Sequence, residues 1–172
     1  MITTKKSGTY YRVCDPLWSN CCDSSFSERS GGRWNPPDAF PVLYLNATIE
    51  TARANAQKVY DGEAYGLFDL NPVARPHLQV VNLVASNPVD AISLEGLHAL
   101  GLPGSYPDGI GHDRCQPIGV AVHRAGHIGI ACRSAAGPNG EELALFKDGL
   151  VTQRQRLSFD DWFFIEQKTE IT

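Results

Sequence analysis

Residues 31–37 read Gly-Gly-Arg-Trp-Asn-Pro-Pro, and the apolar segment Val42-Leu43-Tyr44-Leu45 follows shortly after them. The two glycines predict a tight turn, and the two prolines stiffen the backbone behind it. Ordinary turn punctuation and a surface cation–π pair would account for this pattern. A guanidinium framed by glycine and proline beside aromatic rings is also what a ligand with phosphate groups and rings requires.

A second arginine lies among aromatic residues nearer the start of the chain. The segment Tyr10-Tyr11-Arg12-Val13 is typical of a first strand and carries Arg12. Guanidinium groups bind phosphate oxygens in pairs, so two such arginines suit a diphosphate. We therefore expect Arg12 and Arg33 to anchor one.

Five blocks resemble the RES-domain family, which is named for an arginine, a glutamate and a serine. The blocks are Tyr11-Arg12-Val13, residues 31–37, Leu43-Tyr44-Leu45, Glu50-Thr51-Ala52 and Cys132-Arg133-Ser134. Family members are typically the toxin halves of bacterial toxin–antitoxin pairs, and their fold is similar to that of ADP-ribosyltransferases. The resemblance implies a partner, an Xre-type antitoxin, and a substrate, NAD+. It implies no prosthetic group.

The resemblance also implies the reaction, which is cleavage of the nicotinamide–ribose bond by phosphorolysis or hydrolysis. Phosphorolysis would take inorganic phosphate as co-substrate. Two alternatives stay open: transfer of ADP-ribose to a protein, and a non-catalytic module that binds NAD+ or ADP-ribose.

The resemblance assigns roles to individual side chains. Arg12, Tyr44, Asn55 and Ser134 form the expected catalytic set, and Arg12, Arg33, Tyr44 and Ser134 the expected NAD-binding set, all lining one cleft. Tyr44 either meets nicotinamide or ribose, or is a core tyrosine with a satisfied hydroxyl. Ser134 either hydrogen-bonds a phosphate or ribose hydroxyl, or forms a turn. No His/Asp relay is placed beside Ser134, so we do not expect a nucleophile.

Asn55 is the main departure from the family. The family motif runs Glu-Thr-Ala-x-Ala-Glu, whereas this chain reads Glu50-Thr51-Ala52-Arg53-Ala54-Asn55. An amide can hydrogen-bond a ribose hydroxyl, but it carries no charge to balance an oxocarbenium ion. Another acid, Glu141 or Glu142, could take over; this subgroup could work without an acid there; or the protein could bind NAD+ with little or no turnover.

Composition places the chain among ordinary globular proteins. Its 172 residues, 42% of them hydrophobic, predict one RES-like domain over 1–172, with a core at about 10–146 and a tail at 147–172. The net charge of −4 argues against direct nucleic-acid or anionic-membrane binding. No apolar run of spanning length and no signal-peptide core is present, which predicts a cytoplasmic protein. A homo-oligomer stays an open alternative.

Five cysteines, an odd number, argue against a disulfide framework in the cytosol and predict reduced structural thiols. His112-x-x-Cys115 with Cys14, Cys21 and Cys22 does not have zinc-site spacing, so we expect no metal. His112 is either an acid–base group near neutral pH or a satisfied loop histidine, and Arg114 is a candidate third phosphate contact.

The expected elements mix strands and helices without regular βαβ spacing. Strands are expected at 10–13, 41–45, 65–70, 78–82, 128–133 and 143–146, and helices at 48–59, 94–100 and 116–125, the last with Pro117 at its start. Residues 14–30 are expected to be a loop, and the aromatic segment 159–165 to pack on the core or on a partner. This order predicts an α+β class and a single domain resembling the ADP-ribosyltransferase split-sheet fold.

Overall fold

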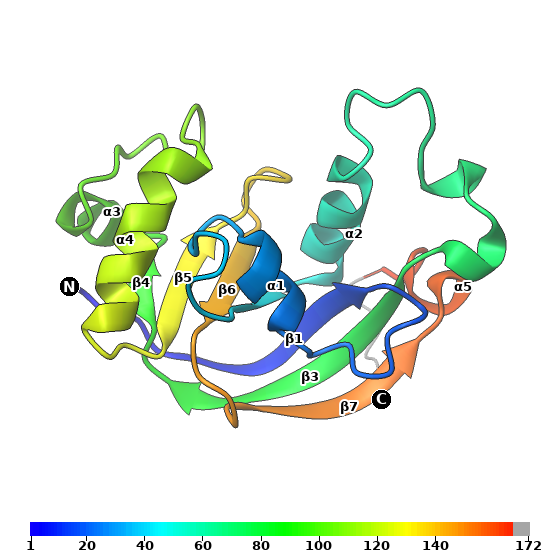
Figure 1. Ribbon diagram of the computed structural model, residues 1–172, viewed down its shortest axis with the longest axis horizontal. Coiled ribbons are helices and arrows are strands. Elements are labelled where there is room, and N and C mark those ends of the chain that lie inside the picture. The colour runs from blue at the N-terminus through cyan, green and yellow to red at the C-terminus, as the bar shows by residue number, and fades with distance from the viewer. Residues whose placement is uncertain (167–172) are drawn as a thin grey trace.

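Seven strands form one curved sheet in the computed structural model, which describes residues 1–166. Across the sheet the order is β4-β5-β6-β2-β1-β3-β7 (Figure 1). The strands are β1 Lys6–Cys14, β2 Leu43–Asn46, β3 His77–Ser86, β4 Val89–Ala91, β5 Gly129–Arg133, β6 Glu141–Leu145 and β7 Val151–Leu157. Only β4 and β5 pair in parallel among these; the other neighbours are antiparallel. The α+β class is confirmed.

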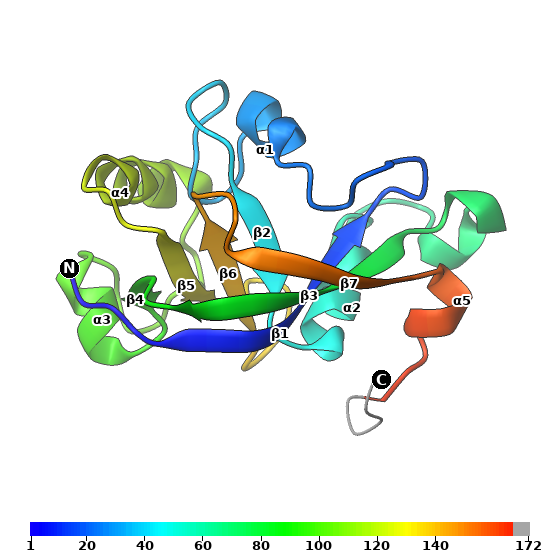
Figure 2. The same ribbon diagram turned by 90° about the horizontal axis from the view of Figure 1, so that it is seen from below.

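The first residues of the chain run along the outer edge of β4. Thr3 forms an antiparallel bridge with Val89, and the amide of Asp90 donates to the carbonyl of Ile2 at 2.8 Å. Figure 2 shows the N-terminus beside β4 and α3, while the body of β1 lies farther along the sheet. The sheet therefore curls, and β5, β6, β2 and β1 form one curved wall.

Helices cover the sheet in two separate groups. They are α1 Ser25–Ser30, α2 Ile49–Lys58, α3 Leu94–Ala99, α4 His112–Arg124 and α5 Phe159–Trp162, with 3-10 turns at Leu67–Asp69 and Pro72–Ala74. In Figure 1, α3 and α4 stand at the β4–β5 end, and α2 and α5 at the opposite end. The predicted helix after residue 48 is confirmed, because the Thr48 hydroxyl caps it by accepting from the Thr51 amide at 3.1 Å.

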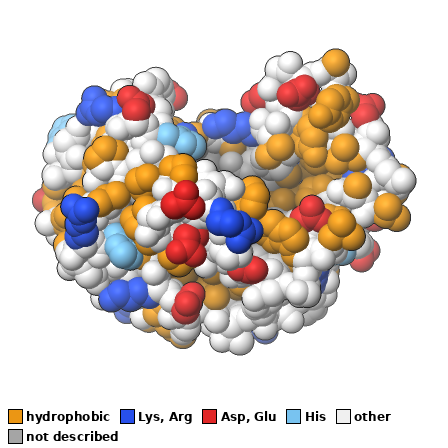
Figure 3. Space-filling model, viewed as in Figure 1, with side chains coloured by type: hydrophobic (Ala, Val, Ile, Leu, Met, Phe, Trp, Pro, Cys, Tyr) orange, Lys and Arg blue, Asp and Glu red, His pale blue; other side chains and the backbone are white. Residues whose placement is uncertain are grey.

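Each helix group stands on its own buried cluster. Trp34, Leu97, Tyr106, Val122 and Ile130 belong to the cluster beneath α3 and α4. Ile49, Ala52, Leu78, Phe159 and Trp162 belong to the cluster beneath α2 and α5. The two groups rise on either side of the sheet centre, and Figure 3 shows a hollow between them with basic and histidine side chains at its rim.

Three predicted elements are wrong. The expected strand at 65–70 is a bend and the 3-10 turn Leu67–Asp69: Tyr65 and Phe68 are exposed, and the Asp69 carboxylate accepts from the Gly66 amide at 2.8 Å. The expected loop 14–30 contains α1. The helix expected from 116 begins at His112, with Pro117 inside it, because the Gly111 carbonyl already accepts from the amides of Arg114 and Cys115.

The segment after residue 146 adds both a strand and a helix. β7, which the sequence did not predict, pairs with β3 from Val151 to Leu157 and forms the edge of the sheet. In α5, Phe159 and Trp162 are buried, and the indole of Trp162 donates to the carbonyl of Pro76 at 2.9 Å. The aromatic segment therefore packs on the core.

The expectation that all cysteines are reduced is wrong. Cys14 and Cys21 are joined in a disulfide, because the loop that leaves β1 returns Cys21 to the strand end with a Cα–Cα distance of 5.4 Å. Cys22, Cys115 and Cys132 are free thiols. Within residues 1–166, no three His, Cys, Asp or Glu side chains gather as a metal site, and no helix is long and apolar enough to cross a membrane.

Candidate active site

A cleft of about 310 Å³, here called the inner cleft, opens between the two helix groups. Its polar and sulfur-bearing lining side chains come from β1, α1, the 31–37 loop, β2, α2, α4, β5 and β6: Arg12, Ser27, Arg33, Tyr44, Asn55, Lys58, His112, Cys132 and Glu142. Arg12, Arg33, Tyr44 and Asn55, which lie far apart in the sequence, thus share one concave surface. Their individual roles stay predictions.

The 31–37 loop is held in place by Asn35. This side chain is completely buried, and its amide donates to the carbonyls of Ser27 at 2.8 Å and Phe40 at 3.0 Å. Helix α4 fixes the other side of the loop, because Gln116 donates to the Gly32 carbonyl at 2.9 Å. At Gly119 the helix lies directly on the carbonyl of Trp34, where any side chain would overlap it. The loop is therefore rigid before any ligand arrives.

Arg33 extends from this rigid loop into the inner cleft. Its Nη1 donates to the carbonyl of Ile110 at 2.9 Å and lies 3.9 Å from the sulfur of Cys115. Within the part of the chain that the structure describes, Ile110 is the only oxygen acceptor of this guanidinium. A guanidinium has five N–H donors, so most remain available to an anion.

Arg12 reaches the same cleft from β1. Its Nη1 donates to the carbonyl of Tyr44 at 3.1 Å, and its Nε to the carbonyl of Cys21 at 3.4 Å. Burial lowers the pKa of Arg12, but arginine remains protonated in proteins. Arg12 therefore provides fixed positive charge at the floor of the cleft.

Tyr44 uses its hydroxyl to hold the loop. The hydroxyl donates to Asn35 Oδ1 at 2.7 Å and accepts from the amide of Trp34 at 3.0 Å. Burial raises the pKa of Tyr44. The hydroxyl thus remains neutral and engaged with the protein, which leaves the ring as the surface that this residue offers to a ligand.

Asn55 lies at the α2 wall of the cleft. Its amide donates to Asn46 Oδ1 at 2.7 Å, and the amide of Asn46 donates in turn to the carbonyl of Tyr11 at 3.1 Å. This chain of bonds links α2 to β2 and β1. The position that holds the acid in the family motif is thus occupied here by a neutral side chain bonded to the sheet.

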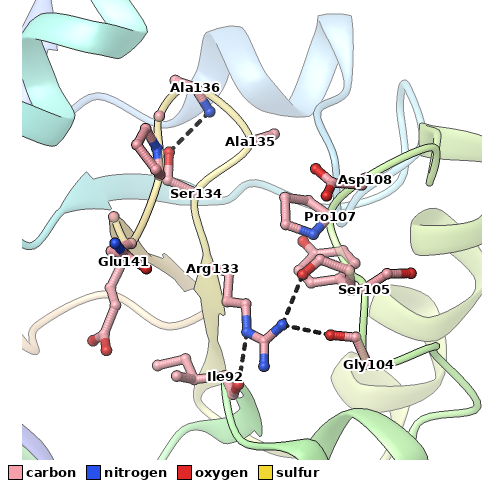
Figure 4. Close-up of a pocket in the computed structure, with 15 residues that line it drawn as sticks. Ile92, Gly104, Ser105, Pro107, Asp108, Arg133, Ser134, Ala135, Ala136 and Glu141 are labelled. Atoms are coloured by element: carbon pink, nitrogen blue, oxygen red, sulfur yellow. Dashed lines mark hydrogen bonds between the residues drawn. The ribbon is translucent and has the colours of Figure 1, made fainter.

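Ser134 lies outside the inner cleft. It lines a larger neighbouring cavity of about 860 Å³, here called the outer cavity, between the β5–β6 turn and residues 104–108 (Figure 4). The hydroxyl of Ser134 is buried and accepts from the amide of Ala136 at 3.1 Å, the geometry of a turn-forming serine. Of the five residues expected to line one cleft, Arg12, Arg33, Tyr44 and Asn55 do so and Ser134 does not; Ala135 lines both cavities.

Arg133 ties the walls of the outer cavity together. It donates to the carbonyls of Ile92 at 2.8 Å, Gly104 at 2.7 Å and Tyr106 at 3.0 Å, the arrangement shown in Figure 4. These bonds join β5 to the segments before α3 and before α4. The hydrogen bonds of Arg133 therefore stabilise the walls of the outer cavity.

The remaining cleft residues include one that the sequence did not reveal. Lys58 is one helical turn beyond Asn55 on α2, a spacing that could have indicated it, and it donates to the carbonyl of Ala135 at 3.1 Å. His112, the first residue of α4, lines the cleft; burial and the nearby charge of Arg33 lower its pKa. Arg114 instead donates to the Gly101 carbonyl and does not line the cleft.

The RES domain family model matches residues 9–163. This chain belongs to the RES domain family. The matched residues run from β1 through α5, so they include β7 as well as every strand that contributes to the inner cleft.

Among curated relatives, the NAD(+) phosphorylase MbcT of Mycobacterium tuberculosis and that of Mycobacterium bovis are each 28% identical to this RES protein over 113 residues. The match covers 60% of this chain and spans 61% of the length of those relatives. A chain in the crystal structure of the M. tuberculosis MbcT–MbcA toxin–antitoxin complex matches with a TM-score of 0.76 at 22% identity, covering 90% of this chain and 85% of that one. The fold is shared.

Proposed function

We propose that this RES protein cleaves the nicotinamide–ribose bond of NAD+, with inorganic phosphate as the acceptor. The observation that carries the proposal is the pair Arg12 and Arg33. Two guanidinium groups from distant segments enter one cleft, and Arg33 keeps most of its donors free of protein acceptors within residues 1–166. The names of the curated relatives, NAD(+) phosphorylases, support the same reaction.

The arrangement suits a reaction that depends on positioning. As the glycosidic bond breaks, positive charge develops on the ribose and nicotinamide leaves as a neutral base. An enzyme gains most by holding the diphosphate and ribose rigidly and by fixing charges around the reacting carbon beforehand. The Asn35 and Tyr44 bonds that hold the 31–37 loop give Arg33 this rigidity.

NAD+ extends through both cavities in this proposal. Ligand cavities of about 300–1,000 Å³ hold drug-sized molecules, so the inner cleft of about 310 Å³ suits one half of a dinucleotide. The outer cavity shares the lining residue Ala135 with it, so in this proposal the other half passes the β5–β6 turn and Ser134. Ser134 is then a binding residue through its turn, whose backbone faces the ligand.

The biological role proposed here is that of a cytoplasmic toxin, a single RES domain over 1–172 whose activity is restrained by an Xre-type antitoxin. Membership of the RES family and the fold shared with a chain of a toxin–antitoxin complex support it. Inducing the gene in a bacterium should deplete NAD+ and stop growth. Co-expression of the antitoxin should prevent both effects.

One incubation tests the reaction. Purified protein is mixed with NAD+ in buffers with and without phosphate, and the products are separated by chromatography. Phosphorylated ADP-ribose that forms only with phosphate supports phosphorolysis, whereas equal ADP-ribose in both buffers indicates hydrolysis. A labelled protein acceptor would indicate a transferase. NAD+ binding without any product would overturn the enzymatic proposal and leave a binding module.

A further inference from the structure

We propose that Glu142 supplies the carboxylate that stabilises the ribosyl cation in this chain, in place of the acid that the family motif has at position 55. The inference rests on the NAD+ cleavage proposed above and names a catalytic residue for it. The substitution moves the charge from helix α2 to strand β6.

Strand register places Glu142 in the inner cleft beside the Asn55 position. On β6 it lies directly opposite Asn46 of β2 and Cys132 of β5. Directly paired residues project from the same face of a sheet. Asn46 is the hydrogen-bond partner of Asn55 on that face, at 2.7 Å, and Cys132 lines the cleft. Glu142 therefore adjoins the Asn46–Asn55 pair.

The Glu142 carboxylate has no protein partner within residues 1–166, where no side chain or backbone amide hydrogen-bonds or ion-pairs with it. The residue is half-buried. After burial, its charge is the next cause that raises the pKa of Cys132, to about 12, which reflects how closely it faces that thiol. A partly buried, unpaired carboxylate is costly unless a ligand compensates it.

Glu141, the other candidate acid, forms an ion pair outside the inner cleft. Successive residues of a strand face opposite sides, so Glu141 points away from the inner cleft. Its carboxylate forms an ion pair with Lys6 at 3.0 Å, and it lines the outer cavity. Register and pairing together select Glu142 over Glu141.

The cleavage of the nicotinamide–ribose bond in this proposal requires no proton transfer. The bond from the ribose carbon to nicotinamide breaks, and its electron pair stays with the nicotinamide nitrogen, which becomes neutral. Positive charge moves from the pyridinium ring to the ribose carbon and ring oxygen. An oxygen of phosphate then donates an electron pair to that carbon. Glu142 stabilises the charge at the ribose and is itself unchanged.

The test compares three single variants with wild type. Glu142→Gln removes only the charge, Glu142→Asp keeps it, and Glu95→Gln, at an exposed position that lines neither cavity, is the matched control. Nicotinamide release is measured at saturating NAD+, and NAD+ affinity by calorimetry. We expect kcat of Glu142→Gln to fall about 100-fold or more, within the range for removing one preorganised electrostatic group, with affinity changed less than about threefold. Glu142→Asp should retain measurable turnover, and Glu95→Gln should match wild type.

The outcomes separate this inference from the proposed function. An active wild type with Glu142→Gln within threefold of its rate overturns the inference alone. A wild type that releases no nicotinamide overturns both. If Glu142→Gln does not fold, as judged by circular dichroism, Glu142→Ala takes its place: kcat reduced about 100-fold with affinity kept supports the inference, and kcat within threefold of wild type overturns it.

Discussion

The inner cleft and the outer cavity differ in how one arginine and one glutamate of each are bonded to the rest of the protein. Each has an arginine and a glutamate in its lining. In the outer cavity Arg133 donates to three carbonyls and Glu141 pairs with Lys6. In the inner cleft, within residues 1–166, Arg33 donates to one oxygen and Glu142 has no partner.

The difference separates side chains that hold the fold together from side chains that are available to a ligand. Polar groups that are withdrawn from water are normally satisfied by the protein itself, as they are around Arg133. Groups without protein partners in a cleft that is held rigid are available to a ligand instead. The size of a cavity is a poor guide here, because Arg133 and Glu141 of the larger one already have protein partners.

The largest effect should come from removing the support in the outer cavity. Arg133→Ala leaves three carbonyls without their charged donor, and we expect the free energy of unfolding to fall by about 3 kcal/mol. Urea denaturation measures it. Arg114→Ala is the control, since Arg114 is exposed and donates a single bond to Gly101. Equal losses for the two variants would break the distinction between the cavities.

Removing the inner arginine should act on binding. Arg33→Ala is expected to weaken NAD+ affinity by about 2 kcal/mol, roughly 30-fold, because a charge-assisted contact is lost. Arg33→Lys keeps a charge without the planar fork and should lose less. Calorimetric titration gives the affinities. Wild-type affinity in both variants would show that the inner arginine is as structural as Arg133.

Tyr44→Phe tests the part of the inner cleft that supports the fold, because the Tyr44 hydroxyl holds the 31–37 loop. The change leaves the amide of Trp34 and the side-chain oxygen of Asn35 without a partner, so we expect a loss of about 1.5–2 kcal/mol in unfolding free energy. Tyr65→Phe, at an exposed position, is the control. Unchanged stability in Tyr44→Phe would mean that the loop holds its shape without the hydroxyl.

The smallest effect tests whether a carboxylate on helix α2 can replace the one on strand β6. In the Glu142→Gln background, Asn55→Glu returns a carboxylate to the family position, and we expect nicotinamide release to recover about tenfold, or about 1.4 kcal/mol in the barrier. The reference is Glu142→Gln alone. No recovery in a folded double variant would show that the cleft accepts the charge only from the strand.

Local signals made much of the fold predictable. Thr48 caps its helix as its residue type suggests, and the aromatic and aliphatic residues around 10–13 and 78–82 mark β1 and β3. Segment 65–70 misled because its aromatic residues suggest a strand, although no strand is available to pair with it in the described residues. The loop between Cys14 and Cys21, residues 15–20, carries no sequence signal that brings the two cysteines together.

The sequence predicted that Arg12 and Arg33 share one cleft, but it did not separate Glu141 from Glu142 and it misplaced Ser134. The aromatic and glycine-rich sequence around Arg12 and Arg33 indicated that they bind a ligand. Glu141 and Glu142 are neighbours of one residue type, and only the register of β6 against β2 and β5 separates their faces. Ser134 ends β5 where the family motif has it, but the turn beyond the strand carries it into the outer cavity.

The close contact between Gly32 and Tyr44 has an evolutionary consequence. A methyl group on residue 32 would lie 2.6 Å from the hydroxyl oxygen of Tyr44, too near for any substitution to fit while the tyrosine keeps its place. This spacing sets the height of Arg33 above the sheet. Descendants of this chain should therefore retain glycine at 32 as long as they retain tyrosine at 44, and a lineage that loses one should be free to change the other. Positions 32 and 44 are thus expected to change together.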